Sequence, residues 1–311
     1  MLRATMRAMN TDCLLLLNAG DQEPARAALT RAAARVEEYE RAFSRFRPDS
    51  DLSQLNDSPA GRVEVPRELA ALLSRALQYA KITGRVFNPL MLRELEALGY
   101  DRTFEEVSIR PSTSHLAPAR RTRRSPVRVD AARGVVTRQP GTRIDLGGVA
   151  KGAAADAALA ELAPYPGALA DLGGDIRTQG QPDDADGWVV GIEDPVSVSG
   201  PSIGYLRLHD GAVATSSVRK RQWTHDGNTV HHIIDPRTGR PSATGVVQCT
   251  AITDTAEHAD VAAKVGLILG AGSLREVDGI GRALGLRGMA WVMVDGRTSC
   301  TAGWKAHAPD F

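Results

Sequence analysis

The chain has 311 residues, of which 42% are hydrophobic and 24% are charged, and its formal net charge at pH 7 is +1. These values are typical of a globular protein, and the length is sufficient for two domains or one large one. Because the charges nearly balance, the composition gives no indication of binding to nucleic acid. No apolar run reaches the length of a transmembrane helix, so we expect no membrane insertion.

The three cysteines, Cys13, Cys249 and Cys300, are far apart and odd in number. They show neither the spacing of a metal site nor a disulfide framework, which fits a reducing compartment. Residues 1–10 contain no apolar core of a signal peptide, so the sequence predicts no leader. Together these features predict a cytoplasmic protein.

The first part of the chain is predicted to be mainly helical. An apolar run within residues 9–18 predicts a buried strand before the first helix. Apolar side chains then recur at helical spacing with charged residues between them. The predicted helices span residues 23–46, 67–82 and 92–98, with a short helical piece within 49–56.

Residues 103–127 are predicted to be a mobile segment with few apolar residues. A basic cluster lies in and next to this segment, at Arg120, Arg121, Arg123, Arg124 and Arg128. Such a cluster is typical of a solvated connection, and binding of an acidic partner is the alternative.

The second half of the chain is predicted to contain more strands than helices. A hairpin is expected at residues 127–137, and a strand beginning at 168 runs into paired glycines. Further strands are predicted at 188–192, 203–208, 211–216, 230–235, 246–252 and 288–294, and helices at 150–162, 255–269 and 274–284. Hairpins outnumber crossovers, which favours an α+β fold over a doubly wound parallel sheet.

Residues 143–156 combine several features of a binding corner. Asp145 is predicted to end a strand, and Gly147 and Gly148 to form a turn before a helix. Lys151 then falls in the first helical turn, where a cation is unfavourable. It therefore needs an anionic partner, and a phosphate would serve. A purely structural strand-turn-helix corner is the other interpretation.

Two further groups of polar residues are candidates for a site. Adjacent residues of a strand point to opposite faces, so His231 and His232 cannot easily serve one site. We expect one to be structural and the other to act as a base or hydrogen-bonding group. Residues 235–239 predict a tight turn. His258 and Asp260 either contact a ligand or lie on a helix surface.

Eight stretches of the sequence resemble, in order, the motifs of ApbE-like FAD:protein FMN transferases. They are Met9–Thr11, Phe43–Asn56, Phe87–Pro89, Asp145–Gly152, Asp171–Ile176, Ala214–Ser216, His232–Gly239 and Ala259–Asp260. The resemblance implies a single T-shaped α+β domain over residues 1–311, with mixed or antiparallel sheets flanked by helices. It also implies an enzyme that splits the FAD pyrophosphate, attaches FMN through a phosphoester to a Thr or Ser of a partner flavoprotein, and releases AMP.

The resemblance also implies roles for individual residues. His232 would accept the hydroxyl proton, Lys151 would face the pyrophosphate, and Mg²⁺ would be the usual cofactor. The metal would contact the backbone of Gly148 and the carboxylate of Asp260. The residues expected to bind FAD are Met9, Phe87, Asn88, Asp145, Lys151, Thr215, Ser216 and Ile233.

One departure from the family pattern falls at the expected metal site. The family has Thr four residues after the Asp of the metal-binding helix, and this chain has Lys264. A lysine ammonium is a donor only and cannot be a Mg²⁺ ligand. At i,i+4 spacing it can instead pair with Asp260. We therefore expect weakened or altered metal dependence. The alternatives are an FAD-binding protein of this fold whose metal-dependent catalysis is lost or altered, and an FAD pyrophosphatase.

Overall fold

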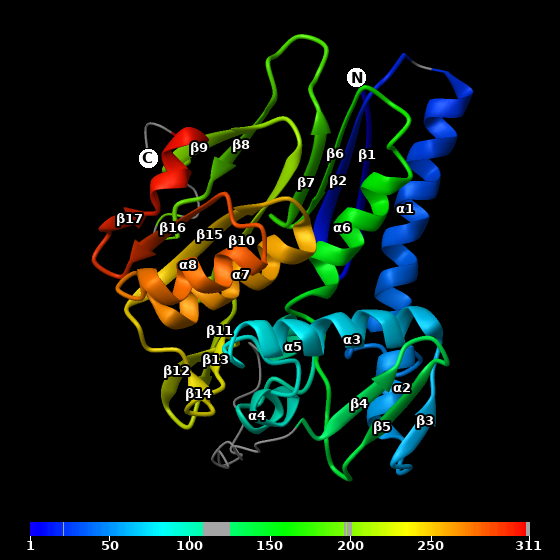
Figure 1. The fold of residues 1–311 in the computed structure, drawn as a ribbon, viewed down its shortest axis with the longest axis vertical. Helices are drawn as coiled ribbons and strands as arrows, with labels where there is room; N and C mark the ends of the chain where they lie inside the picture. The colour runs from blue at the N-terminus through cyan, green and yellow to red at the C-terminus, as the bar shows by residue number, and fades with distance from the viewer. Residues whose placement is uncertain (21, 108–124, 196, 198–200, 309–311) are drawn as a thin grey trace. The chain divides into compact units, whose positions relative to one another are not determined.

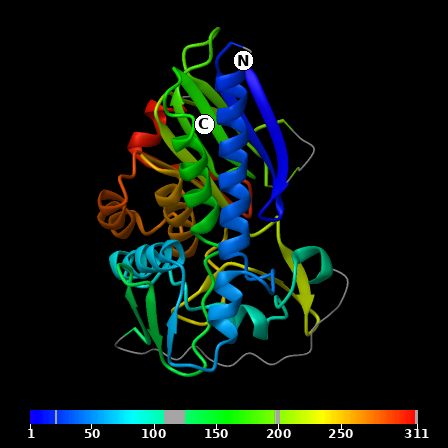
Figure 2. The same cartoon turned by 90° about the vertical axis from the view of Figure 1, so that its right-hand side faces the viewer.

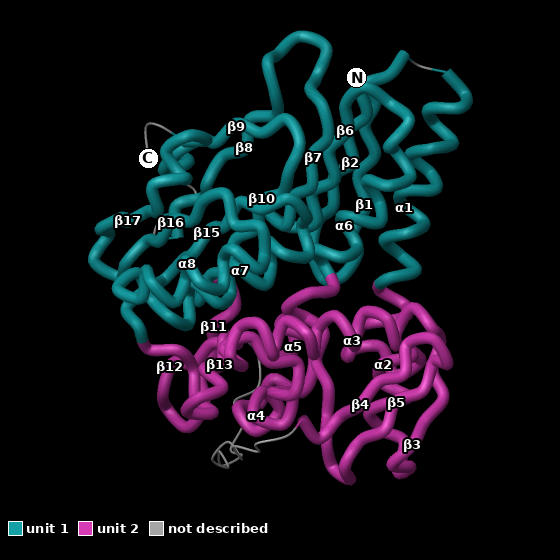
Figure 3. The backbone as a smooth tube through the Cα atoms, in the orientation of Figure 1, with its two compact units in different colours: residues 1–39, 151–219, 244–311 teal, residues 40–150, 220–243 magenta. Residues whose placement is uncertain are grey.

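The computed structural model describes residues 1–20, 22–107, 125–195, 197 and 201–308. The chain forms two compact units, each assembled from separate stretches of sequence (Figure 3). Unit 1 comprises residues 1–39, 151–219 and 244–311, and unit 2 comprises residues 40–150 and 220–243. Of the predicted basic cluster, Arg128 lies in unit 2, and Arg120, Arg121, Arg123 and Arg124 lie outside the described residues.

Unit 1 is organised around a sheet that has eight strands within the described residues (Figure 1). Every pair of neighbouring strands is antiparallel. In sheet order the strands are β1 (Leu2–Ala8), β2 (Thr11–Asn18), β6 (Gly167–Leu172), β7 (Ile176–Gly180), β10 (Gly211–Ser217), β15 (Val246–Thr253), β16 (Gly288–Met293) and β17 (Thr298–Cys300).

The first two strands correct one prediction. A single strand was expected within residues 9–18, but Met9 and Asn10 form the turn between β1 and β2, with φ of 52° and 59°. Positive φ at both central residues is the geometry of a two-residue hairpin turn, which matches the twist of the flanking strands. The sequence of β1 gave a weak signal because this edge strand alternates between half-buried and exposed residues.

The two faces of the sheet in unit 1 are covered by different elements. One face packs against a hairpin of β8 (Trp188–Ile192) and β9 (Gly204–Leu208), and against the 3₁₀ helix η1 (Ala302–Ala306). Helix α7 (Ala256–Leu269) packs on the other face, over β10 and β15. Strand β15 is therefore buried along its whole length, which explains its continuous apolar and small-residue sequence.

Helices α1, α6 and α8 complete the described part of unit 1. Helix α1 (Glu23–Phe43) lies beside α6 (Ala150–Ala160) in both views (Figures 1 and 2), and Arg31 Nε lies 3.2 Å from Glu161 Oε2 just beyond α6. Helix α8 (Leu274–Ala283) packs against α7. The division into units falls within α1, after Tyr39, and after the first residue of α6.

Helices α6 and α7 approach so closely that a glycine is required between them. A Cβ atom built on Gly152 would lie 2.2 Å from the backbone oxygen of Ala256. No side chain can be accommodated at that distance without moving one helix. Gly152 therefore sets the separation of the two helices that carry Lys151 and Asp260.

Unit 2 combines short helices with small sheets. Its three-stranded sheet has the order β3 (Arg62–Glu64), β5 (Val135–Arg138), β4 (Val127–Asp130), and the other pairs are β11 (Gln222–His225) with β12 (Asn228–His231) and β13 (Ile234–Asp235) with β14 (Arg240–Pro241). The helices are α2 (Asp51–Asp57), α3 (Arg67–Ile82), α4 (Leu92–Ala97) and α5 (Phe104–Val107). One core cluster joins α4 and α5 to Tyr100, Trp223 and Ile234.

The predicted α+β class is confirmed, and most predicted elements lie within a few residues of the observed ones. Helix α3 has the predicted bounds. Two further predictions are corrected: residues 143–145 were expected to form a strand and belong to none, and the strand expected at 230–235 is divided between β12 and β13. None of the helices within the described residues combines the length and the apolar character that a membrane span needs.

We predict that Gly152→Ala destabilises the protein, although alanine has the better helix propensity. The added Cβ forces α6 and α7 apart, and overpacking of this kind costs about 2 kcal/mol. Gly279→Ala in α8 is the matched control, because no atom lies within 4 Å of its built Cβ; it should stabilise by up to about 1 kcal/mol. Urea unfolding measures both changes, and equal stabilities for the two variants would contradict the close approach.

Candidate functional site

In unit 1, Lys151 at the start of α6 forms a buried ion pair with Asp175. The Asp175 side chain is 2% exposed and that of Lys151 is 19% exposed. The position of Lys151 in the helix predicted an anionic partner, and that partner is the carboxylate of Asp175 in the same unit. The ammonium group is held in one place at the N-terminus of α6, and the Lys151 side chain remains partly exposed to solvent.

The β6–β7 turn presents Asp175 to Lys151. Gly173 and Gly174 have φ of 69° and 94°, which other residues adopt with strain. The N–H of Gly174 donates to Asp171 Oδ1 at 2.7 Å, and the N–H of Leu172 donates to the carbonyl of Asp175 at 3.0 Å. The paired glycines that the sequence placed after a strand therefore form a hairpin turn that ends at the buried carboxylate.

Helix α7 of unit 1 is anchored to α6 through its N-terminus. The carboxylate of Asp156 accepts hydrogen bonds from the N–H groups of Ala256 and Glu257, each at 2.9 Å. Burial raises the pKa of Asp156, although these N–H groups and Arg177 act in the opposite direction. Because Asp156 satisfies the first free N–H groups of α7, it fixes where this helix begins.

Asp260 lies in the second turn of α7 and is 6% exposed. Its Oδ2 atom is buried and has no hydrogen-bond partner among the described residues. Within that part of the chain Asp260 also makes no ion pair, so the direct pairing with Lys264 that the spacing suggested is not formed. A buried, unsatisfied carboxylate oxygen is costly, which marks this position as a candidate for a cation or a donor group.

Thr215 and Ser216 of β10 point to opposite faces of the sheet in unit 1. Ser216 pairs with Cys249, whose sulfur lies against Gly266 of α7, so Ser216 is on the α7 face. Thr215 pairs with Thr250, and their hydroxyl oxygens are 2.9 Å apart on the other face. The structure therefore brings Ser216, but not Thr215, to the face that α7 covers.

In unit 2, the segment leading to Asp145 is held by a side chain in place of a strand. Asn56 accepts from the N–H of Ile144 and donates to its carbonyl, both at 2.8 Å. The N–H of Asp145 donates to the carbonyl of Pro89 at 2.8 Å. The carboxylate of Asp145 then accepts from the N–H of Gly147 at 2.9 Å, which stabilises the turn that contains Gly148.

Arg45 lies beside Asp145 and was not predicted to have a role. Its guanidinium group is 4.1 Å from the ring centroid of Phe46 and 4.5 Å from that of Tyr100. It donates to the carbonyl of Tyr100 at 2.8 Å, and its Nε is 3.7 Å from Asp145 Oδ1. The two aromatic rings thus hold a buried cation next to the carboxylate.

The two neighbouring histidines of unit 2 differ in their contacts. The Nε2 atom of His231 is 3.1 Å from the carbonyl of Ser242, and its Nδ1 accepts from the N–H of Ile233 at 3.3 Å. Burial lowers the pKa of His231, so its neutral form is favoured. His231 is the structural histidine, whereas His232 lies with its ring edge toward Tyr100 at 6.4 Å between centroids.

The remaining predicted residues have mainly local contacts. Met9 occupies the β1–β2 turn of unit 1. In unit 2, Phe87 is buried against Tyr79, and Ile233 is also buried. The Oδ1 of Asn88 accepts from the N–H of Leu90 at 3.1 Å, so part of this side chain is used in its own turn.

The residues of α7 do not fit a complete Mg²⁺ site. No group of three His, Cys, Asp or Glu side chains within the described part of the chain is arranged to hold a metal ion. Asp260 offers one buried oxygen, but Lys264, one turn later, offers a cation where a ligand oxygen is expected. Mg²⁺ needs several oxygen ligands in near-octahedral geometry, which the carboxylates of α7 do not supply by themselves.

Comparison with known proteins identifies the family. The family model described as "ApbE family" matches residues 9–278. A protein of Treponema pallidum (strain Nichols) named FAD:protein FMN transferase is 32% identical over 273 residues, covering 82% of this chain and 75% of that protein. One of the same name from Klebsiella pneumoniae (strain 342) is 29% identical over 260 residues, covering 81% and 78%. The chain therefore belongs to the ApbE family.

Solved structures agree with this assignment. The ApbE protein of Thermotoga maritima is 27% identical, with a TM-score of 0.81 and 98% of each chain covered. The flavin transferase ApbE of Vibrio cholerae is 21% identical, with a TM-score of 0.78 and 98% of each chain covered, and supports the fold alone. The α+β fold that the eight motifs implied is thus the ApbE fold.

We predict that Asp175→Asn destabilises the protein by about 3 kcal/mol, because it leaves the largely buried Lys151 without its counter-charge. Asp186→Asn is the control: this exposed carboxylate lies 2.8 Å from Nε2 of His209, and loss of the contact should cost less than about 1 kcal/mol. Chemical denaturation followed by circular dichroism compares the two. A small, equal effect in both variants would show that the Lys151–Asp175 pair contributes little.

Proposed function

We propose that the chain is an FAD:protein FMN transferase. The match that carries this proposal is the 32% identity to the Treponema pallidum transferase, which extends over 82% of the chain. The region that the family model matches, residues 9–278, includes the segments that hold Asp145, Lys151, His232 and Asp260. The reaction takes FAD and a protein hydroxyl, and gives an FMN phosphoester and AMP.

The proposed chemistry requires no covalent enzyme intermediate. The hydroxyl oxygen of a Thr or Ser in the acceptor attacks the phosphorus of the FMN half of FAD, and a phosphoester bond forms. The pyrophosphate P–O bond to the AMP half breaks, and AMP leaves with the bridging oxygen. The hydroxyl proton passes to a base, so charge and atoms balance. Such a reaction depends on positioning and on cations near the phosphate oxygens.

Lys151 is the proposed cation for the phosphate oxygens. Its pair with Asp175 and its position in the first turn of α6 hold the ammonium in a defined place. The N-terminus of a helix favours negative charge, so a phosphate group near Lys151 would also interact favourably with the dipole of α6. Asp175 is the residue that orients Lys151 before substrate binds.

His232 is the proposed proton acceptor of unit 2. The neighbouring His231 is excluded from this role because both of its ring nitrogens contact backbone groups. Asp145 is proposed to hydrogen-bond the nucleotide, with Arg45 keeping its carboxylate in place. These roles rest on the family motifs together with the local contacts of each residue.

Mg²⁺ is the usual cofactor implied by the family resemblance, and we propose that this chain uses it differently. The ion would normally supply positive charge to the phosphate oxygens. In α7, Asp260 would contribute an oxygen ligand, and Lys264 brings a positive charge to the same helix. None of the three cysteines forms a disulfide, which favours a reducing compartment, so we expect a cytoplasmic acceptor protein.

Incubation of the purified protein with FAD and a candidate acceptor peptide, with and without Mg²⁺, tests the activity. Mass spectrometry should find a peptide heavier by one FMN group, together with free AMP. Release of AMP and free FMN without peptide modification would instead identify an FAD pyrophosphatase. Retention of intact FAD without any cleavage would identify an FAD-binding protein that lacks the transferase activity.

We predict that Lys264→Thr increases the stimulation of FAD cleavage by Mg²⁺ about tenfold or more, because a hydroxyl oxygen replaces a cation at the expected ligand position. Lys305→Thr, at an exposed lysine of η1 in the same unit, is the control and should leave the stimulation unchanged. Rates are measured over a Mg²⁺ titration. A wild-type enzyme that already depends fully on Mg²⁺ with ordinary affinity would contradict the role given to Lys264.

A further inference from the structure

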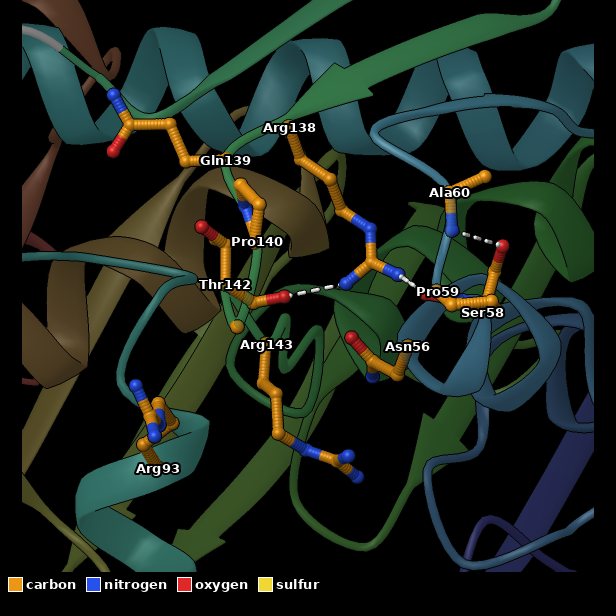
Figure 4. Close-up of a pocket in the computed structure, with 11 residues that line it drawn as sticks. Asn56, Ser58, Pro59, Ala60, Arg93, Arg138, Gln139, Pro140, Thr142 and Arg143 are labelled. Carbon is orange, nitrogen blue, oxygen red and sulfur yellow. Dashed lines mark hydrogen bonds between the residues drawn. The ribbon is translucent and has the colours of Figure 1, made fainter.

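Unit 2 contains a pocket of about 360 Å³ that none of the family motifs explains (Figure 4). It is formed by α4, by the end of α2 with the loop after it, and by the end of β5 with the loop after it. Helix α4 contributes Arg93, and the other lining residues are Asn56, Ser58, Pro59 and Ala60 from the second segment and residues 138–143 from the third. Three guanidinium groups therefore line one pocket, although the chain as a whole is nearly neutral.

Arg138 is a buried cation without a counter-ion in this pocket. The residue is 7% exposed, and its guanidinium group donates to the carbonyl of Thr142 at 2.6 Å and to that of Ser58. No carboxylate forms an ion pair with Arg138 within the part of the chain that the structure describes. A buried charge is costly unless an opposite charge compensates it.

The carboxylates near the pocket are already engaged by Arg143. Its Nη1 lies 3.4 Å from Asp57, and its Nη2 lies 3.0 Å from Glu96. Arg93 is exposed and forms no ion pair with any described residue. Its guanidinium group lies close to the loop after β5, because Nη1 would be 3.5 Å from a Cβ atom built on Gly141. Asp57 and Glu96 thus both bind Arg143, and Glu94 attracts Arg93 electrostatically.

The electrostatics of Arg138 agree with an excess of positive charge. Burial lowers its pKa, the positive charge of Arg143 lowers it further, and the negative charge of Asp57 acts in the opposite direction. An arginine remains protonated in spite of such shifts, so the repulsion between Arg138 and Arg143 persists. An anion in the pocket would relieve it. The loop that carries Arg143 is fixed by the two hydrogen bonds between Asn56 and Ile144, so the pocket is formed before any ligand enters.

We infer that this pocket binds a phosphate group, either as inorganic phosphate or as a small phosphate monoester. A single carboxylate is satisfied by one bidentate arginine, whereas a tetrahedral dianion accepts hydrogen bonds from several directions. The pocket is larger than one phosphate requires, and Pro59 and Pro140 offer apolar surface for an organic group. This inference is independent of the transferase reaction and of its substrate.

Isothermal titration of the FAD-free full chain tests the inference, with inorganic phosphate and glycerol 2-phosphate as probes at constant ionic strength. Wild type should bind at least one probe, and the tighter one identifies the source of the phosphate group. Arg93→Gln should weaken binding about tenfold or more, because one charged donor is lost. Ala60→Phe should weaken it by filling the pocket without changing any charge.

Arg133→Gln is the matched control, because Arg133 is an exposed arginine of unit 2 in the β4–β5 turn. Unchanged affinity in this variant, with reduced affinity in Arg93→Gln and Ala60→Phe, supports the pocket. Absence of binding by wild type to both probes overturns the inference. It is also overturned if Arg93→Gln binds as tightly as wild type, or if Arg133→Gln loses affinity to the same extent.

Discussion

The close approach of α6 to α7 is the constraint on which the candidate residues of unit 1 depend. Gly152 and Asp156 are four residues apart, so they lie on one face of α6. The first allows the backbones to touch, and the second binds the N–H groups that begin α7. Lys151 leaves the same helix toward Asp175. The positions of Lys151 and Asp260 are therefore linked through one close backbone approach and one buried carboxylate.

Unit 2 positions its candidate residues by a different means. Asn56 gives Ile144 the two hydrogen bonds that a neighbouring strand would have given, and Arg45 is held between two aromatic rings beside Asp145. An amide side chain can replace a strand because it carries both a donor and an acceptor. The segment before Asp145 is consequently fixed without belonging to a sheet, and the adjacent Arg143 is fixed with it.

Periodic features of the sequence predicted most of the fold, whereas contacts between residues far apart in the chain could not be predicted from the sequence. Helix α3 has the predicted bounds because its apolar spacing is regular and uninterrupted. Residues 143–145 looked like a strand, since extended backbone has the same sequence signal whether its partner is a strand or Asn56. The need of Lys151 for an anion was predictable, but Asp175 as its partner was not, because the pairing depends on how β6, β7 and α6 pack. Likewise the sequence predicted that one histidine is structural, and the contacts of His231 show which one.

The order of strands in unit 1 has a consequence for the synthesis of the chain. Cys13 of β2 pairs with Leu172 of β6, and the whole stretch 40–150 of unit 2 lies between them in the sequence. The β1–β2 hairpin leaves the ribosome early, but the edge of β2 that pairs with β6 has no partner until β6 has been translated. Closing such a long loop is slow, and an unpaired strand edge is prone to association with other chains in the meantime. Translation speed across residues 40–150 therefore sets how long that edge is exposed in the nascent protein.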